Sequence, residues 1–280
     1  MIRFRYLRPQ TIEEAWKLKN EIADSSFIAG GTDILVKIKN NEVRPSALIS
    51  LRLLQELKKI GLQNGARIGS LVTITSLLAN EPLHEKYPLL KEAAKNMACV
   101  QIRNVATVGG NLCNASPSAD IALALLTLEA TLRLSSPQGD RLVPVDEFFK
   151  GEGKICLSQN EILTEIILGP PPLRFRVAFL KKGRVKMDLA VVSLACLFEI
   201  EGKKCHKARI SAGSAAPRPL RLRMVEELLE GEVITKRLIS EAQKIAQKNI
   251  QPISDIRGSE EYRRELISVF LKRALEQLFD

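Results

Sequence analysis

The chain has 280 residues, of which 45% are apolar and 26% charged, and its formal net charge is +10. This balance is typical of a globular protein, and the length allows two domains with separate hydrophobic cores. The longest apolar run, near residues 121–132, is interrupted by Thr127 and Glu129, so no transmembrane span is predicted. The first ten residues contain no apolar block, which indicates no secretory signal, and a cytoplasmic chain is expected.

The predicted elements begin with a strand over residues 2–7, in which basic and apolar side chains alternate. Thr11 and Glu14 form a capping box that predicts the start of a helix. A second strand, "SFIAG", then runs into Gly30-Gly31, and the apolar residues after the pair have helical spacing. This stretch predicts a strand, a glycine turn and a helix.

A hairpin, two helices and a second glycine pair follow. Asn64-Gly65 between two strand-like segments predicts a type I′ hairpin, and helices are expected near 73–79 and 88–97. The second pair, Gly109-Gly110, follows the β-branched run "VATV" and precedes a polar loop. Ser118 is the expected N-cap of an apolar helix over about 120–130.

Residues 131–145 predict another hairpin, and "EILTEIIL" predicts a further strand. The proline run at 170–172 ends that strand and marks the expected domain boundary. A strand-rich segment with a turn at "EGKK" follows, and then three amphipathic helices near 219–230, 235–249 and 259–279. Ser259 is the expected N-cap of the last helix. Its predicted core-facing stripe is Leu266, Val269, Phe270, Leu275 and Leu278.

The positive charge is uneven along the chain. Residues 173–280 hold 22 Lys and Arg against 14 Asp and Glu, whereas residues 1–172 hold 20 against 18. The basic residues alternate with acids along helices, and the chain has only 13 aromatic residues, so nucleic-acid binding is not predicted. The surplus instead indicates a solvated basic face or one that meets an acidic protein partner.

Cysteine and histidine usage indicates reduced thiols and no metal site. The five cysteines are odd in number and never spaced as C-x-x-C. The two histidines, His84 and His206, lie far apart in sequence and have no companion ligands nearby.

Each Gly-Gly pair could be an ordinary tight turn or a ligand-binding loop. Glycine lets ligand atoms touch the main chain, and a Gly-Gly step can expose successive N–H groups to an anion. Thr32 and Thr107 could donate hydroxyl hydrogen bonds to a phosphate, and Asn111 could donate through its amide. Neither loop has the spacing of a Rossmann or P-loop motif. Two such loops fit a diphosphate held from two sides, so a dinucleotide site stays open beside the turn interpretation.

Three segments carry a resemblance to a known family. "FIAGGTDILVKIK", "VQIRNVATVGGNLCNASPSADIALALLTLEA" and "ARISAGSAAPRPLRLRMVEELLEG" resemble the signature regions of the FAD-binding medium subunit of molybdenum hydroxylases, the xanthine dehydrogenase and carbon monoxide dehydrogenase type enzymes. The resemblance covers essentially the whole chain. It implies an α+β fold, in which residues 1–172 form the two-subdomain FAD-binding fold of the vanillyl-alcohol-oxidase (PCMH) type. Residues 173–280 would form a small α+β domain made of a sheet and helices.

The resemblance also implies which residues bind FAD, between the two subdomains. Asp120 would bind the ribityl or ribose part, Leu163 would pack near the isoalloxazine ring, and Lys181 or Lys182 would reach its pyrimidine end. A fixed cation there would stabilise reduced flavin and raise its potential. From the residues alone, the lysines could equally be solvated, and Asp120 could complement a helix dipole. The glycine loops would hold the pyrophosphate through Phe27, Ile28, Ala29, Gly30, Gly31, Thr32, Asp33 and Ile34, and through Thr107, Val108, Gly109, Gly110 and Asn111.

The implied function is that of an oxidoreductase subunit in a heteromeric complex. A large partner subunit would carry the molybdenum cofactor, and a small one would carry two [2Fe–2S] clusters. FAD on this chain would take their electrons and pass them to NAD⁺, a quinone or O₂. A self-contained flavin oxidase of the same fold is the alternative, and a subunit that has lost flavin is a third. Asp188 is expected to be structural, with Arg184 as its partner.

Overall fold

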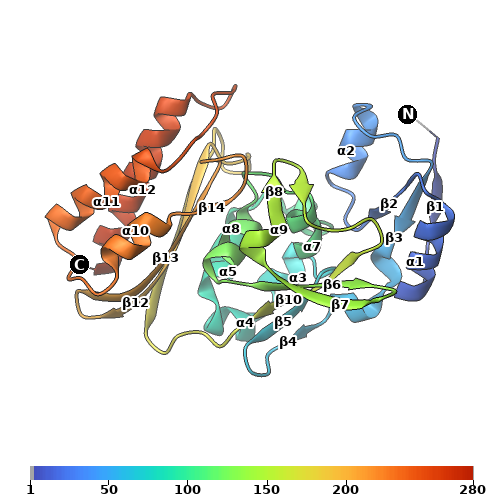
Figure 1. Ribbon diagram of the computed structural model, residues 1–280, viewed down its shortest axis with the longest axis horizontal. Coiled ribbons are helices and arrows are strands. Elements are labelled where there is room, and N and C mark those ends of the chain that lie inside the picture. Colours follow the sequence, from blue (N-terminus) through green and yellow to red (C-terminus); the bar gives the residue numbers. More distant parts are fainter. Residues whose placement is uncertain (1–2, 280) are drawn as a thin grey trace.

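In the computed structural model, which describes residues 3–279, the N-terminal part of the chain is a small parallel sheet with helices (Figure 1). Its strand order is β1-β3-β2, and both pairings are parallel. The elements are β1 (Arg5–Leu7), α1 (Ile12–Glu21), β2 (Ser25–Ile28), α2 (Ile34–Lys39) and β3 (Ala47–Ser50), followed by the 3-10 turns η1 (Leu51–Leu53) and η2 (Gln55–Lys58). The predicted first strand began at Ile2, which lies outside the described residues.

The central part is a five-stranded antiparallel sheet in the order β4-β5-β10-β6-β7. Its strands are β4 (Ile60–Gly61), β5 (Ala66–Gly69), β6 (Thr131–Ser136), β7 (Gly139–Pro144) and β10 (Ile162–Leu168), with the small pair β8 (Phe149–Gly151) and β9 (Lys154–Ile155) beside it. Its helices are α3 (Ile74–Leu78), α4 (Glu81–Lys86), α5 (Pro88–Asn96), α6 (Val100–Arg103), α7 (Val108–Cys113), α8 (Asp120–Thr127) and α9 (Val145–Phe148).

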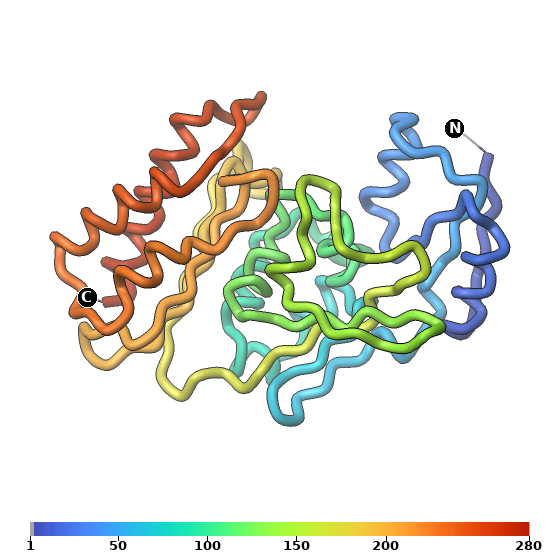
Figure 2. The backbone as a smooth tube through the Cα atoms, viewed as in Figure 1, coloured from blue at the N-terminus to red at the C-terminus, as the bar shows by residue number. Residues whose placement is uncertain are grey.

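The C-terminal part is a four-stranded antiparallel sheet with three helices, at the opposite end of the long axis from β1–β3 (Figure 2). Its strands are β11 (Phe175–Lys182), β12 (Val192–Glu201), β13 (Lys204–Gly213) and β14 (Leu220–Arg221). Its helices are α10 (Arg223–Leu229), α11 (Lys236–Lys248) and α12 (Glu260–Phe279), which pack on the sheet through one apolar core. Within residues 3–279, no helix is both long and apolar enough to cross a membrane.

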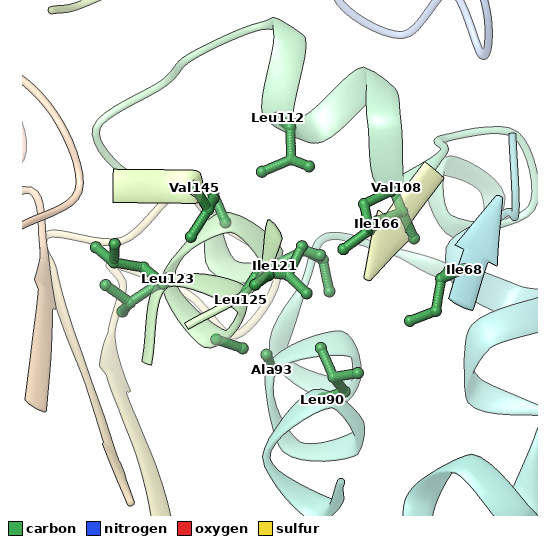
Figure 3. Packing of buried hydrophobic residues seen from close by; sticks show 14 of the residues in the cluster. Ile68, Leu90, Ala93, Val108, Leu112, Ile121, Leu123, Leu125, Val145 and Ile166 are labelled. Atoms are coloured by element: carbon green, nitrogen blue, oxygen red, sulfur yellow. The ribbon is translucent and has the colours of Figure 1, made fainter. Parts of the chain in front are cut away.

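Helix α8 forms the centre of the molecule because every residue of it is buried. A helix that is apolar all round must be covered on all sides. Ile121 and Leu125 pack with Val108, Leu112 and Ile166 in the central core (Figure 3). Its other side meets the C-terminal sheet, where the Thr127 hydroxyl lies 3.5 Å from the Ala195 carbonyl oxygen. This burial places Asp120, its first residue, deep between the two domains.

Ion pairs join the C-terminal domain to carboxylates of the first 172 residues. Five cations of the C-terminal part point across the junction. Lys181 pairs with Asp120 at a nitrogen–oxygen distance of 2.6 Å. Arg209 and Arg221 pair with Glu129 at 2.6 and 3.3 Å, and Arg218 and Arg223 pair with Asp146, both at 3.1 Å. Part of the basic surplus therefore faces an acidic surface of the same chain, which composition could not reveal.

Several local predictions are confirmed. Thr11 accepts the Glu14 amide at 3.2 Å at the start of α1, although the Glu14 carboxylate accepts from Gln10 instead of closing the box on Thr11. The hairpin between β4 and β5 forms, and Asn64 and Gly65 in its turn have positive φ values, but the last pair is Gly61 with Arg67, so the loop is longer than the two residues of the predicted type I′ turn. Ser259 caps α12 by accepting the Tyr262 amide at 3.2 Å.

Other local predictions are wrong. Ser118 does not cap α8, because its hydroxyl pairs with that of Ser116 at 3.0 Å and Ala119 occupies the cap position. The same helix ends at Thr127, before Glu129, which has a φ of +53°. In the stripe of α12, Val269 is only half-buried, whereas Arg263 is fully buried. Helix α10 starts at Arg223 because the preceding residues pair as a strand with β13.

Candidate functional site

A cavity of about 840 Å³ opens where the two subdomains and the C-terminal domain meet. This volume lies in the upper part of the usual range for ligand pockets, about 300–1,000 Å³. Fifteen of the sixteen residues predicted from the sequence line it. The exception is Val108, whose side chain packs in the central core and whose amide donates to the Val72 carbonyl. The cavity therefore brings together segments as far apart in the chain as Phe27 and Lys181.

The first glycine loop presents unused main-chain donors. Gly31 has a φ of +83°, a conformation that favours glycine, and it turns the chain from β2 into α2. Among residues 3–279, no acceptor is bonded to the amides of Gly31, Thr32, Asp33 or Ile34, all of which line the cavity. Four adjacent unbonded amides can donate to an anion.

Arg52 fixes this loop from outside the cavity. Its Nε donates to the Ala29 carbonyl oxygen and its Nη2 to that of Gly30, both at 3.0 Å. Because both carbonyls are held by one guanidinium, the main chain before Gly31 has a defined orientation. Arg52 lies 22 residues after Gly30, and no local pattern in the sequence indicates this contact.

The second glycine loop uses its amides internally, and the prediction that it exposes them to an anion is wrong. The residues from Val108 to Cys113 form helix α7 rather than a turn and a polar loop, and Thr107 is its N-cap. The Gly109 amide donates to the Ser70 carbonyl at 2.8 Å, and the Gly110 amide donates to Thr107 Oγ1 at 3.0 Å. The Asn111 amide donates to the Thr107 carbonyl. Within residues 3–279, Thr107 Oγ1 and Asn111 Oδ1 act as acceptors, so the Thr107 hydroxyl hydrogen and the Asn111 Nδ2 hydrogens are available to a ligand.

The glycines of the two pairs lack a side chain for different structural reasons. A Cβ on Gly30 would lie 2.2 Å from the Val105 carbonyl oxygen, and one on Gly109 would lie 2.6 Å from Ser70 Cβ. These two glycines are therefore required by contacts within the protein. A Cβ on Gly110 would have only Thr107 Oγ1 near it, at 2.9 Å. Gly110 is thus the glycine whose missing side chain leaves room on the cavity side.

Asp120 and Lys181 form a buried ion pair on the cavity wall. Lys181 Nζ lies 2.6 Å from Asp120 Oδ2 and also donates to the Asn96 carbonyl at 2.9 Å, and both side chains are 5% exposed. Burial raises the pKa of Asp120 to about 6, against the opposing effect of the Lys181 charge. Asp120 Oδ1 is buried without a hydrogen-bond partner in residues 3–279. Such an orphan acceptor at a cavity wall is suited to a ligand donor.

The structure separates the two candidate lysines. Lys181 lines the cavity, whereas Lys182, the next residue on β11, does not line it and is exposed. Asp188 pairs with Arg184 at 2.6 Å, as predicted, at the rim of the cavity. Leu163 on β10 is buried and lines the cavity.

Further cavity residues were not singled out from the sequence. Glu161 receives two hydrogen bonds from Arg141, at 2.5 and 2.8 Å, and this partner lowers the pKa of its carboxyl to about 2. Asn114 links the two loops, because its side-chain Nδ2 donates to Asp33 Oδ1 at 2.9 Å. Burial raises the pKa of Cys113 to about 12, so it stays a neutral thiol. Across the described residues, no group of three His, Cys, Asp or Glu is arranged to hold a metal ion.

Comparison with known proteins gives matches over both parts of the chain. A family model described as the FAD binding domain in molybdopterin dehydrogenase matches residues 2–171. A second, described as the CO dehydrogenase flavoprotein C-terminal domain, matches residues 177–278. The xanthine dehydrogenase FAD-binding subunit of Escherichia coli O157:H7 is 32% identical, over 97% of this chain and 94% of that protein. The carbon monoxide dehydrogenase medium chain of Afipia carboxidovorans is 30% identical, over 98% and 96%.

Solved structures are similar over the same extent. A carbon monoxide dehydrogenase from Hydrogenophaga pseudoflava, which lacks the Mo-pyranopterin moiety, matches with a TM-score of 0.96 and 30% identity, covering 100% of this chain and 99% of that one. Quinoline 2-oxidoreductase from Pseudomonas putida 86 matches with a TM-score of 0.94 and 28% identity, covering 99% and 97%. The likeness therefore includes all three parts of the molecule.

Proposed function

The chain belongs to the FAD-binding medium subunits of the molybdenum hydroxylase family, and from that premise we propose that it holds FAD in the cavity and transfers electrons between partner chains and an external acceptor. The observation that carries the proposal is the convergence of fifteen predicted residues on one cavity. We propose that residues 1–172 are the FAD-binding domain and residues 173–280 the smaller domain that closes it.

The residues of the cavity fit FAD. The unbonded amides of the first loop provide donors for a pyrophosphate, and the Thr107 hydroxyl provides one more from the opposite loop. Gly110 leaves space at the second loop because it has no side chain there. Asp120 Oδ1 and the Lys181 ammonium add a buried acceptor and a buried cation to the cavity wall.

The residues of the cavity would then have separate roles in binding FAD. When bound, FAD accepts electrons singly and can deliver two to one acceptor, which is chemistry that no side chain of this chain supplies. The first loop and Thr107 would bind the phosphates, and Leu163, a buried apolar residue of the wall, would pack near the ring and exclude water there. Lys181 holds a positive charge at a fixed place, which stabilises negative charge on a reduced ligand. Asp188 and Arg184 hold the rim between β11 and β12.

The proposal extends to partners. A large subunit would carry the molybdenum cofactor and a small one two [2Fe–2S] clusters, and the electrons would leave to NAD⁺, a quinone or O₂ in the cytoplasm. Relatives of this chain are named as a medium chain or as an FAD-binding subunit, and these names support a heteromeric assembly. The basic face of the C-terminal domain is a candidate contact for an acidic partner.

The test is to purify the chain alone and together with its co-expressed partners, and to record absorption spectra. A yellow chain that releases FAD on acid treatment is expected. Molybdenum and iron should then co-purify with the complex and be absent from the isolated chain. A colourless chain that cannot be loaded with FAD would contradict the proposal, and a flavoprotein that never associates with molybdenum or iron would contradict its electron-transfer part.

A further inference from the structure

The cavity has a further buried cation, Lys19, at the end away from Lys181. Lys19 belongs to α1 and is 9% exposed, and it lines the cavity together with Ser25 and Phe27 of β2. Helix α1 and strand β2 lie in the N-terminal part of the molecule, at the opposite end of the long axis from the C-terminal domain (Figure 1). Nothing in the proposed function uses Lys19.

Lys19 has no ion-pair partner that explains its burial. Its Nζ donates to the Ser25 carbonyl oxygen, and within residues 3–279 its other two hydrogens have no acceptor. Burial lowers the pKa of Lys19, and Asp24, whose charge opposes this effect, is exposed and forms no ion pair with it in the same range. A buried cation with unused donors is costly, and a ligand that supplies an acceptor offsets the cost.

Phe27 makes the same place suitable for a flat aromatic group. The Lys19 ammonium lies over the Phe27 ring, 5.9 Å from the ring centroid. A base that stacks on this ring would have one edge near the ammonium. The ring nitrogens of adenine at such an edge accept hydrogen bonds, whereas the ammonium can only donate them.

The position along β2 indicates which half of FAD reaches this place. Ser25 and Ile28 are the first and last residues of β2, and a strand advances about 3.3 Å per residue, so Ser25 lies about 10 Å from the end of the strand. The first glycine loop, whose amides would bind the pyrophosphate, comes after that end. Lys19 is therefore too far away to contact the pyrophosphate, and lies within reach of the adenosine attached to it.

We propose that Lys19 recognises the adenine of bound FAD, by donating a hydrogen bond to one of its ring nitrogens while the base stacks on Phe27. The inference rests on the proposed function, since it concerns the same bound FAD. It adds a specificity-determining residue on α1, outside both glycine loops and outside the three segments that resemble the family.

The test compares FAD with three analogues, in which N1, N3 or N7 of the adenine is replaced by a C–H group. Dissociation constants are measured on the full apo chain by quenching of flavin fluorescence. The native chain is expected to bind one of the three at least about tenfold more weakly than FAD, because that analogue leaves the ammonium without its acceptor. Lys19→Met should lose at least about tenfold in FAD affinity and should bind all three analogues within about twofold of FAD.

A control variant and a second measurement separate recognition from packing. Lys17→Met removes a lysine from the same helix whose side chain is 75% exposed and does not line the cavity, so this variant should keep the native affinities. Lys19→Met replaces an unpaired buried cation by an apolar side chain of similar length, so the urea midpoint of the apo variant should not fall below that of the native chain. A lower midpoint combined with native discrimination among the analogues would make Lys19 a packing residue and overturn the inference.

Equal affinities of the native chain for FAD and all three analogues would overturn the inference without requiring any variant to fold. It would equally be overturned if Lys19→Met still discriminated against the same analogue as the native chain. A native chain that binds neither FAD nor any analogue would instead contradict the proposed function, and the inference with it.

Discussion

The two glycine loops look alike in sequence, yet their main chains do opposite things. In the first loop, the amides from Gly31 to Ile34 have no acceptor within the described residues. In the second, the amides of Gly109 and Gly110 are bonded to Ser70 and to Thr107. The first loop can therefore bind an anion through its main chain, and the second can contribute only side chains and space.

The same contrast applies to the glycines. Gly30 and Gly109 are excluded from carrying a side chain by neighbouring protein atoms, whereas Gly110 faces free space apart from one hydroxyl. A Gly-Gly pair thus does not by itself indicate contact with a ligand. Substitutions at these positions should separate stability from cofactor binding.

The largest effect is expected for Gly30→Ala. Its Cβ would overlap the Val105 carbonyl oxygen, which belongs to the backbone and cannot swing away. We expect a loss of about 3 kcal/mol in the free energy of unfolding, at the upper end of overpacking costs. Urea denaturation of the apo chain measures it. The control is Gly61→Ala, where no atom lies within 4 Å of the added Cβ, and its change should stay within about 0.5 kcal/mol. Equal stabilities of the two variants would contradict the packing argument.

Gly110→Val should separate binding from folding. The added Cβ would meet one protein atom, Thr107 Oγ1 at 2.9 Å, and this side-chain oxygen can shift, so part of the capping stability is lost while the circular dichroism spectrum should be unchanged. We expect FAD affinity to fall at least about 100-fold, or about 2.7 kcal/mol, because the valine takes space that the cofactor needs. Fluorescence titration measures the affinity. Retention of FAD at native affinity would show that the second loop does not face the cofactor.

Arg52→Gln tests the orientation of the first loop. Arg52 is exposed, so its replacement should leave the fold intact while releasing the carbonyls of Ala29 and Gly30. The loop amides then lose their fixed direction, and FAD affinity should drop about tenfold. Arg52→Lys, which cannot donate to both carbonyls in the same way, should be intermediate. The matched control is Arg67→Gln, an exposed arginine away from the cavity, and an equal loss of affinity there would count against the loop as the cause.

Much of this architecture could be predicted from the sequence, because it is local. The cap at Thr11, the hairpin at Asn64-Gly65 and the turn into α2 each depend on residues within a few positions of one another. The three signature segments then indicated the family and the residues that line the cavity.

Contacts between distant segments could not be predicted in this way. The acceptors of the Val108 and Gly109 amides are the carbonyls of Val72 and Ser70, and nothing in "VATVGG" indicates them. The partner of Lys181 is 61 residues away. Successive residues of a strand point to opposite faces, so only one of Lys181 and Lys182 could face the cavity. The side-chain positions identify Lys181 as that one, because it lines the cavity and pairs with Asp120, whereas Lys182 is exposed.

The smallest expected effect is a difference in stability between substitutions of Thr107 and Thr32, the threonines beside the two glycine pairs. Thr107 Oγ1 accepts the Gly110 amide as the cap of α7, so Thr107→Val leaves that amide without its acceptor and should lower the free energy of unfolding by about 1 kcal/mol. Thr107→Ser keeps the hydroxyl and should restore most of this loss. Thr32 instead donates to the exposed Asp33 carboxylate, and Thr32→Val should change stability by less than about 0.5 kcal/mol. Chemical denaturation of the apo variants measures all three. Equal losses at Thr32 and Thr107 would mean that the first loop is also organised by its own cap, and its amides could then no longer be regarded as reserved for a ligand.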